Sequence, residues 1–157
     1  MSEHALPIAV QHASLKDLEV LYEIEKGCFT EEAFFREQIA HFLKASDAVN
    51  LVAQVNGEIA WFILGLIEHH KKSCVGHVYT IDVASRYRRM GVGLRLLEAT
   101  EEDFQKRGAE ACFLEVRFNN LAARELYRKN GYTELGKLEN YYARGNHGIR
   151  LKKKLKK

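Results

Sequence analysis

A pair of glycines at the start of a helix is the feature that most constrains the fold of this chain. The stretch YRRMGVGLRLLEAT, residues 87–100, places Gly91 and Gly93 after a strand-like apolar segment and before an amphipathic helical pattern. A helix N-terminus exposes backbone N–H groups without intrahelical acceptors and carries a partial positive charge. Because glycine has no Cβ, a bulky anion can approach this backbone closely. The stretch therefore predicts an anion-binding turn between a strand and a helix.

Spacing excludes the two most common nucleotide-binding motifs. A dinucleotide-binding loop needs a third glycine where Leu96 stands, and a P-loop needs a Gly-Lys-Ser/Thr sequence that this chain lacks. What remains is Arg-x-x-Gly-x-Gly over residues 88–93, in which Arg88 and Arg89 would add charge for further phosphate groups. An ordinary strand–helix turn, in which glycine serves tight packing alone, is the alternative.

Periodicity along the rest of the chain predicts alternating strands and helices in a single domain, residues 1–157. No linker rich in Pro, Ser or Gly interrupts the 157 residues, and 46% of them are apolar. Strands are expected at residues 7–13, at 50–55 and 58–69 around the hairpin signal Asn56-Gly57, and at 73–84, 109–118, 132–135 and 147–155. Helices are expected from Ser14 to Gly27, within residues 29–45, from the glycine stretch to Gly108, and from Asn119 or Asn120 to Gly131. This order predicts a mixed sheet with helices on its faces.

Three motifs in this order resemble the GNAT N-acetyltransferases. They are the loop at residues 88–93, LEVRFNNLAARELYRKNGY at residues 114–132, and NYYARGNHGIRLKKKL at residues 140–155. The last two are most similar to the RimI-like and Ard1-type protein N-terminal acetyltransferases. The resemblance covers the whole chain and implies an α/β fold of the α+β kind. Its twisted, mixed, mostly antiparallel sheet would have about seven strands and be flanked by four helices.

The resemblance also implies acetyl-CoA as the acetyl donor and assigns residues that hold it. Main-chain groups of Ile81 and Val83 would pair with the pantetheine arm. Asn120 would contact the cofactor near the thioester, and Tyr127 would lie close to the sulfur. The pyrophosphate would be bound by the loop residues Arg88, Arg89, Met90, Gly91, Val92, Gly93 and Leu94.

Glu115 and Tyr127 are the predicted catalytic residues. The even positions of ACFLEVRF form an apolar face, which puts Glu115 on the other face of an interior strand. The resemblance makes Glu115 the general base and Tyr127 the acid that protonates the departing sulfur. The structural alternatives are an ion pair of Glu115 with Arg117 or a basic helix residue, and a core tyrosine with a satisfied hydroxyl.

A protein N-terminus is the expected acceptor. An α-amine titrates near pH 7.7–8.0 and a lysine amine near 10.4, so the α-amine has a roughly hundredfold or larger advantage in neutral fraction at neutral pH. The predicted function is acetyl transfer from acetyl-CoA to the N-terminal α-amine of proteins or peptides by direct attack on the thioester, with a ribosomal protein as one candidate substrate. A small-molecule amine or a lysine side chain is an alternative acceptor. A non-catalytic CoA-binding or ribosome-associated module is the other alternative.

The acceptor is expected between residues 29–35 and residues 140–145. Tyr141 and Tyr142 could hydrogen-bond a peptide backbone, or they could simply pack at a strand end. Phe29 belongs to the first segment, where Glu31 or Glu32 could attract an ammonium group. This segment, CFTEEAFF, has neither the Pro-Trp pattern of bacterial RimI-like enzymes nor the Leu-Pro-Glu-Asn pattern of Ard1-type enzymes. The resemblance therefore supports the reaction and leaves the specificity open.

Composition narrows the partners and the location. A net charge of +3 does not by itself indicate nucleic-acid binding, and the basic run LKKKLKK at residues 151–157 is expected to be a solvated strand end rather than a nucleic-acid or ribosome contact. We expect no membrane span and no signal peptide. The scattered cysteines Cys28, Cys74 and Cys112 favour reduced thiols in the cytoplasm. The histidines lack metal-ligand spacing, so no metal is expected. The expected state is a monomer or a weak homodimer.

Overall fold

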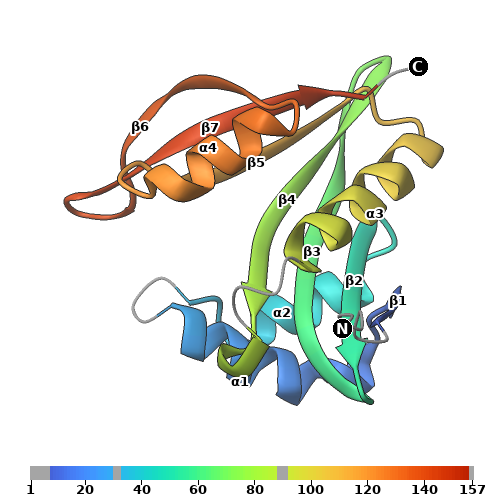
Figure 1. Cartoon of the computed structure of the whole chain (residues 1–157). Helices are drawn as coiled ribbons and strands as arrows, with labels where there is room; N and C mark the ends of the chain where they lie inside the picture. Colours follow the sequence, from blue (N-terminus) through green and yellow to red (C-terminus); the bar gives the residue numbers. More distant parts are fainter. Residues whose placement is uncertain (1–7, 30–32, 88–91, 156–157) are drawn as a thin grey trace, which may run out of the picture. The chain divides into compact units, whose positions relative to one another are not determined.

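The computed structural model describes residues 8–29, 33–87 and 92–155, with Val92 as backbone only (Figure 1). Its strands are β1 (Ile8–His12), β2 (Ala48–Val55), β3 (Glu58–His70), β4 (Ser73–Val83), β5 (Ala111–Arg117), β6 (Thr133–Ala143) and β7 (Asn146–Lys154). Its helices are α1 (Leu18–Cys28), α2 (Arg36–Lys44), α3 (Val92–Lys106) and α4 (Leu121–Lys129), with the short 3-10 turns η1 (Leu15–Asp17) and η2 (Ser85–Tyr87). The order of elements is the one that periodicity predicts.

The strands form one seven-stranded sheet in the order β1-β2-β3-β4-β5-β7-β6. β1 pairs antiparallel with β2, and β7 pairs antiparallel with both β5 and β6. β4 and β5 are parallel, because α3 connects them and returns the chain in the same direction. The predicted fold class, a mixed and mostly antiparallel sheet with four helices, is confirmed.

The described residues divide into two compact units. The first lies within Met1–Leu64 and Thr80–Thr100, and the second within Gly65–Tyr79 and Glu101–Lys157. Strands β3 and β4 and helix α3 contribute residues to both units. A single domain over residues 1–157 stays a prediction.

Local signals shape the first unit. The β2–β3 hairpin turns at Asn56 and Gly57, whose φ values of 52° and 81° lie in the left-handed region that these two residue types tolerate. Ser14 N–H donates to Asp17 Oδ2 at 2.9 Å, so the predicted capping residue closes the start of η1. The core of this unit is built from the apolar faces of its helices and strands, with Leu21, Ile39, Val49, Ala53, Phe62 and Leu64 among its buried side chains.

In the second unit, helix α3 is fixed by Phe104. The buried ring of Phe104 occupies the space in which a Cβ would stand at Gly76, and it also lies against Gly65. Both glycines belong to the central strands β3 and β4, so their missing side chains let the helix approach the sheet. The helix ends as predicted at Gly108, whose φ of 93° lies in the left-handed region.

Strand β6 is longer than the sequence predicted. We expected residues 132–135, and the strand runs to Ala143. Its pairing with β7 contains two register shifts, one after Glu134 and one after Leu138. Each shift interrupts the period-two alternation of side chains, which is why residues 136–143 carry no clear strand pattern.

The basic run near the C-terminus forms the end of β7. Lys152 and Lys154 are exposed, and Lys153 Nζ pairs with Glu101 Oε1 at 2.9 Å. The described part of the run is thus a strand end, as the pattern predicts, with one lysine in an ion pair. In the part of the chain that the structure describes, no helix combines the length and the apolarity needed to cross a membrane.

Candidate active site

Glu115 is held by two basic side chains from the neighbouring strands. It lies on β5 directly opposite Arg150 of β7, and Arg150 Nε donates to its Oε2 at 2.7 Å. On its other side, His77 Nε2 of β4 lies 2.8 Å from Oε1. The Glu115 side chain is only 5% exposed. The sequence suggested Arg117 or a basic helix residue as the ion-pair partner of Glu115, but the partner in the structure is Arg150. Arg150 lies directly opposite Glu115 on the next strand, which brings the two side chains closer together than Glu115 and Arg117 on the same strand.

His77 continues this chain of polar contacts. Its Nδ1 lies 3.2 Å from Glu68 Oε2, and the Tyr79 hydroxyl donates to the same carboxylate oxygen. The His77 and Tyr79 rings stack with their centroids 4.1 Å apart. A cavity of about 210 Å³ is lined by Glu68, His70, Val75, His77, Phe113 and Arg150. This volume has room for several water molecules, so a proton on His77 has access to water.

The charges around Glu115 decide its protonation. Burial alone would raise the pKa of Glu115, but the hydrogen bonds and charges of His77 and Arg150 outweigh it and lower the pKa. Burial alone would lower the pKa of His77, but the hydrogen bond and charge of Glu115, with Glu68 in addition, raise it. At neutral pH Glu115 is therefore an anion that can accept a proton.

Asn120 is the N-cap residue of α4, and Tyr127 lies within this helix. Tyr127 is half-buried and meets Tyr132 edge-on, with ring centroids 5.7 Å apart. Burial raises the pKa of Tyr127 to about 12, so its phenol keeps its proton at neutral pH. Asn120 caps the helix, because its Oδ1 accepts the N–H of Ala123 at 3.1 Å. This bond fixes the orientation of the Asn120 amide.

Tyr141 and Tyr142 lie beside Glu115. Their rings form an edge-to-face pair with centroids 4.9 Å apart. Burial, followed by the charge of Glu115, raises the pKa of the Tyr141 hydroxyl, which also contacts Arg150. Tyr141 is 42% exposed, so a ligand can reach it. The second unit thus brings together three of the predicted site residues: Glu115, Tyr141 and Tyr142.

In the first unit, the predicted pyrophosphate loop leads to the start of α3. Arg88, Arg89, Met90 and Gly91 lie outside the described residues, and α3 begins at Val92. Gly93 and Leu94 form its first turn, where backbone N–H groups have no intrahelical acceptor. A Cβ built on Gly93 would meet the Trp61 indole only at 3.7 Å, an ordinary contact. Among the described atoms, tight packing therefore does not explain this glycine, and the turn fits an anion.

Ile81 and Val83 lie on β4 and are half-buried. The Val83 carbonyl accepts the Cys28 thiol at 3.2 Å. A carbonyl oxygen has two lone pairs, so Val83 can still accept a further N–H donor. The stretch therefore fits the strand-like pairing that the resemblance implies for a pantetheine arm.

Asp82, which lies between Ile81 and Val83 in the sequence, forms a buried acidic pair with Glu25. The two residues are 1% and 2% exposed. Thr80 Oγ1 lies 2.6 Å from Asp82 Oδ1 and 3.2 Å from Glu25 Oε1, although its single proton can serve only one of them. Asp82 Oδ2 has no hydrogen-bond partner among the described residues other than the Glu25 carboxyl, which it can bind only through a shared proton. Burial and this neighbour raise the pKa of Asp82 well above its usual value.

The predicted acceptor segment follows α1. Phe29 is half-buried and donates its N–H to the Glu25 carbonyl at 2.9 Å. Phe34 N–H donates to Glu25 Oε2 at 2.9 Å. Glu31 and Glu32 lie outside the described residues. Across residues 8–29, 33–87 and 92–155, no three His, Cys, Asp or Glu side chains converge in the manner of a metal site.

Comparison with known proteins gives the family. The model of the acetyltransferase (GNAT) family matches residues 18–132. The chain belongs to this family. This GNAT protein is 33% identical over 145 residues to an N-alpha-acetyltransferase of Sulfurisphaera tokodaii, with 87% of this chain and 86% of that one covered. It is 31% identical over 130 residues to the [ribosomal protein bS18]-alanine N-acetyltransferase of Escherichia coli, with 80% and 81% covered. Its structure resembles that of Ard1 from Thermoplasma volcanium, with a TM-score of 0.82, 26% identity and 96% and 99% of the two chains covered.

The structure adds His77 and Arg150 to the candidate site of this GNAT acetyltransferase. Sequence reasoning judged His77 only by metal-ligand spacing and passed over Arg150. One signal was available: the alternation in GHVYT puts His77 and Tyr79 on one face of a strand that precedes a parallel neighbour. Parallel pairing of β4 with β5 then aligns His77 with Phe113, two residues before Glu115.

Proposed function

We propose that this protein transfers the acetyl group of acetyl-CoA to the N-terminal α-amine of a protein or peptide. The observation that carries the proposal is the buried Glu115 carboxylate, held between His77 and Arg150 in a GNAT chain. The curated relatives named N-alpha-acetyltransferase support the choice of acceptor. Glu115 would act as general base, either directly or through a water molecule.

The acidity of the acceptor suits such a base. An α-amine with a pKa near 7.7–8.0 is about 10–20% neutral at pH 7, so the site does not have to remove its first proton. The amine becomes strongly acidic once it attacks a carbonyl, and a carboxylate is then basic enough to take the proton. Both oxygens of Glu115 retain lone pairs beside their bonds to His77 and Arg150. The proton can leave by His77 once His77 Nδ1 has released its own proton toward Glu68 and the 210 Å³ cavity, because Nε2 can then accept the proton from Glu115.

Tyr127 is the proposed proton donor. Its raised pKa, about 12, keeps the hydroxyl protonated at neutral pH. Acetyl-CoA supplies an activated acyl group in the form of a thioester. In the proposal the residues that hold it are Ile81, Val83, Arg88, Arg89, Met90, Gly91, Val92, Gly93, Leu94, Asn120 and Tyr127. Phe29, Glu31, Glu32, Tyr141 and Tyr142 would face the acceptor.

A thiol-release assay tests the proposal. Acetyl-CoA is offered with short peptides whose first residue is Ala, Ser, Thr, Met or Glu, and with an N-blocked peptide that contains lysine. We expect turnover on the free N-termini and none on the blocked peptide. Turnover on the lysine peptide or on free polyamines that equals or exceeds that on N-termini would replace the proposed acceptor. CoA binding without turnover on any amine would indicate a non-catalytic module.

The proposal also includes a cytoplasmic location and a monomer or weak homodimer. Cys28, Cys74 and Cys112 form no disulfide in the described part of the chain, which suits a reducing compartment. Sedimentation over a hundredfold range of protein concentration tests the oligomeric state. A stable dimer at the lowest concentration would contradict it.

A further inference from the structure

The tip of the β6–β7 hairpin departs from regular antiparallel pairing. Leu138 faces Gly148 and Ala143 faces Asn146, so five residue steps along β6 match two steps along β7. The extra residues of β6 form an irregular bulge that contains Tyr141 and Tyr142. In a regular strand, consecutive side chains point to opposite faces. The bulge interrupts this alternation, so the side chains of Tyr141 and Tyr142 need not point to opposite faces of the sheet.

Asn140 and His147 hold the bulge in place. Asn140 has a φ of 56°, a left-handed conformation that asparagine tolerates better than most residues. Its N–H donates to His147 Nδ1 at 2.9 Å, and its Oδ1 accepts the N–H of Gly145 at 2.8 Å. The His147 carbonyl in turn accepts the N–H of Phe118, just after β5, at 2.9 Å. These bonds replace the strand pairing that the bulge interrupts, and they tie the hairpin to the strand that carries Glu115.

Gly148 leaves room for both rings. A Cβ at this position would stand 3.2 Å from Tyr141 Cδ2 and 3.2 Å from Tyr142 Cε2, closer than most real Cβ contacts. The φ of Gly148 lies outside the left-handed region, so its backbone does not require glycine. The rings require it, because both tyrosines pack over the same point of β7. The Arg117 guanidinium lies over the Tyr142 ring at 5.3 Å and supports the pair from β5.

The two tyrosines end up beside the proposed general base. Arg117 faces Gly148 across the β5–β7 ladder, and Glu115 faces Arg150 two pairs further along the ladder, on the same side of the sheet. The Tyr141 hydroxyl contacts both Glu115, which raises its pKa, and Arg150, which lowers it. With 42% of its surface exposed, Tyr141 offers a hydroxyl next to the place where the acceptor amine must stand.

We propose that Asn140, His147 and Gly148 are positioning residues that set the Tyr141–Tyr142 pair against the backbone of a peptide acceptor. The inference rests on the proposed function, since it needs a peptide as acceptor. The three residues form no part of the reacting centre. They determine the binding of the acceptor and leave the binding of acetyl-CoA unchanged.

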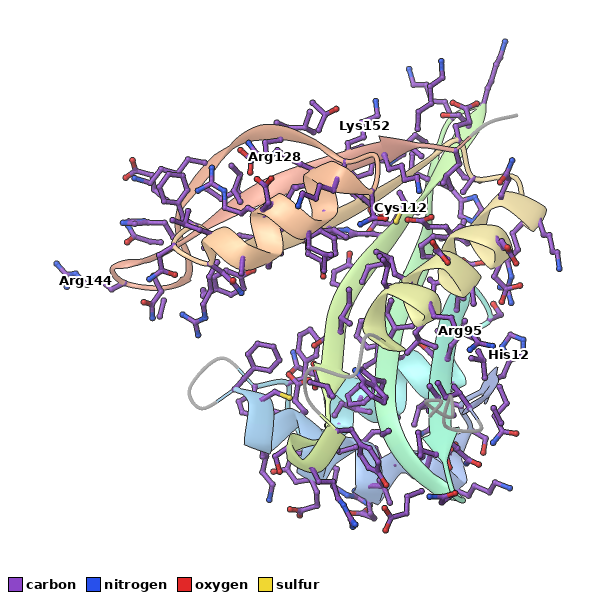
Figure 2. All side chains as sticks on the ribbon, viewed as in Figure 1. His12, Arg95, Cys112, Arg128, Arg144 and Lys152 are labelled. Atoms are coloured by element: carbon purple, nitrogen blue, oxygen red, sulfur yellow. The ribbon has the colours of Figure 1, made fainter. Side chains whose placement is uncertain are left out.

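Four variants test this. Gly148→Ala pushes the rings apart, and His147→Phe keeps the ring shape but removes the acceptor for Asn140 N–H. His147→Asn restores an acceptor near the position of Nδ1 and serves as the rescue. Lys152→Gln is the matched control, because Lys152 is an exposed residue of the same strand, β7, and lies outside the segment expected to border the acceptor (Figure 2). For each variant we measure the KM for an acceptor peptide with a free N-terminus, the KM for acetyl-CoA, and kcat.

We expect Gly148→Ala and His147→Phe to raise the peptide KM by roughly tenfold, the effect of losing about one hydrogen bond to the ligand. The KM for acetyl-CoA should stay within about twofold, and His147→Asn and Lys152→Gln should resemble the wild type in every constant. A peptide KM unchanged in both disruptive variants overturns the proposal, and so does an equal rise in both KM values.

Near-ultraviolet circular dichroism separates this inference from the proposed function. The rigid tyrosine pair gives a signal that Gly148→Ala and His147→Phe should reduce and His147→Asn should retain, whether or not any peptide is acetylated. If the wild type acetylates no peptide but the signal changes as expected, the proposed function fails, while the positioning of the two tyrosines by Asn140, His147 and Gly148 is supported. If peptides are acetylated but the signal is the same in all variants, these three residues do not position the tyrosines, while the proposed function is supported.

Discussion

Glu115 and His77 lie on adjacent parallel strands with 2.8 Å between Glu115 Oε1 and His77 Nε2. Each side chain shifts the pKa of the other toward its charged form. Arg150 and Glu68 extend the pair at its two ends. The cation keeps the carboxylate ionised, and in the proposed mechanism the same contact would serve both the stability of the fold and the chemistry.

The stability of the protein should therefore depend on the protonation of His77. The folded state raises the pKa of His77, so its contribution is complete below the unfolded value near 6.5 and is lost as pH rises through the folded pKa. The folded state lowers the pKa of Glu115, so that contribution is present above about pH 4.5 and is lost as pH falls through the folded pKa. Urea unfolding of wild type and His77→Gln at pH 5 to 9 measures this. We expect the wild type to be more stable by about 1–3 kcal/mol near pH 5–6, with a difference that shrinks toward pH 9. A difference that does not change with pH would contradict the assignment.

Replacing Glu115 by Gln should abolish most of the turnover. The amide keeps the size of the side chain and can still accept from Arg150, but it cannot take a proton from the amine. We expect kcat with a peptide acceptor to fall by about 10²–10⁴ while the affinity for acetyl-CoA stays within about twofold. Steady-state kinetics and calorimetric titration measure the two quantities. Glu139→Gln, on the exposed part of β6, is the control and should behave as the wild type. Equal activity of the two variants would remove Glu115 from the mechanism.

Replacing Tyr127 by Phe should slow the reaction without weakening the fold. Because the pKa of this tyrosine is about 12, the wild-type hydroxyl stays protonated up to about pH 10, and we expect no loss of activity from its ionisation below that pH. The Phe variant should lose roughly 10²-fold in kcat at every pH, since a general acid contributes about 10²–10⁴. The pH profile of kcat for both proteins is the measurement. Tyr22→Phe on α1 serves as the matched control, and a Tyr127→Phe variant as active as this control would assign Tyr127 to packing.

Local signals made most of the fold predictable. Asn56-Gly57 marks a hairpin because both residues tolerate positive φ, and the structure has 52° and 81° there. Asn120 caps a helix, and Gly131 ends it with a φ of 99°. Each signal depends only on residues close in the chain, so one sequence was sufficient to place the elements.

The partners of Glu115 could not be predicted in this way. His77 precedes it by 38 residues and Arg150 follows it by 35, and the three meet only because the strand order is β4-β5-β7. A strand order is a property of the whole sheet, and the sequence pattern of one strand does not contain it. The bulge of β6 escaped prediction for a related reason, since its register depends on hydrogen bonds from Asn140 to β7 and to the turn.

The buried Asp82 should cost stability at neutral and alkaline pH. Its pKa is raised in the folded state, so the unfolded chain releases this proton at a lower pH than the folded chain does. Folding stability therefore falls as pH rises from the unfolded value near 3.9 to the folded value, and the penalty is complete above it. Asp82→Asn supplies a permanent donor to Glu25 and removes the titration. At pH 8 we expect this variant to be more stable than the wild type by about 1–3 kcal/mol, the cost of a buried polar group without its partner.

Urea unfolding at pH 4 and pH 8 checks that prediction. The advantage of Asp82→Asn should nearly vanish at pH 4, where both proteins carry a neutral group at this position. Glu23→Gln on the exposed side of α1, where the native side chain pairs with Lys26, is the control and should stay within about 0.5 kcal/mol of the wild type. A variant less stable than the wild type at pH 8 would show that the Asp82 carboxylate is well solvated or paired.

The approach of α3 to the sheet should depend on Gly76. A Cβ there would overlap the ring of Phe104, which is fully buried. We expect Gly76→Ala to lower the free energy of unfolding by about 1–3 kcal/mol or more, as overpacked cores do. Gly136→Ala on β6 is the matched control, because a Cβ at that position meets no heavy atom within 4 Å and the backbone is not left-handed. Urea unfolding at pH 7 compares the two.

Since the clash is with one ring, Phe104→Leu should recover part of the stability lost by Gly76→Ala, although the same change alone should destabilise the wild type. If both glycine variants are equally stable, the ring of Phe104 does not set the distance between α3 and β4.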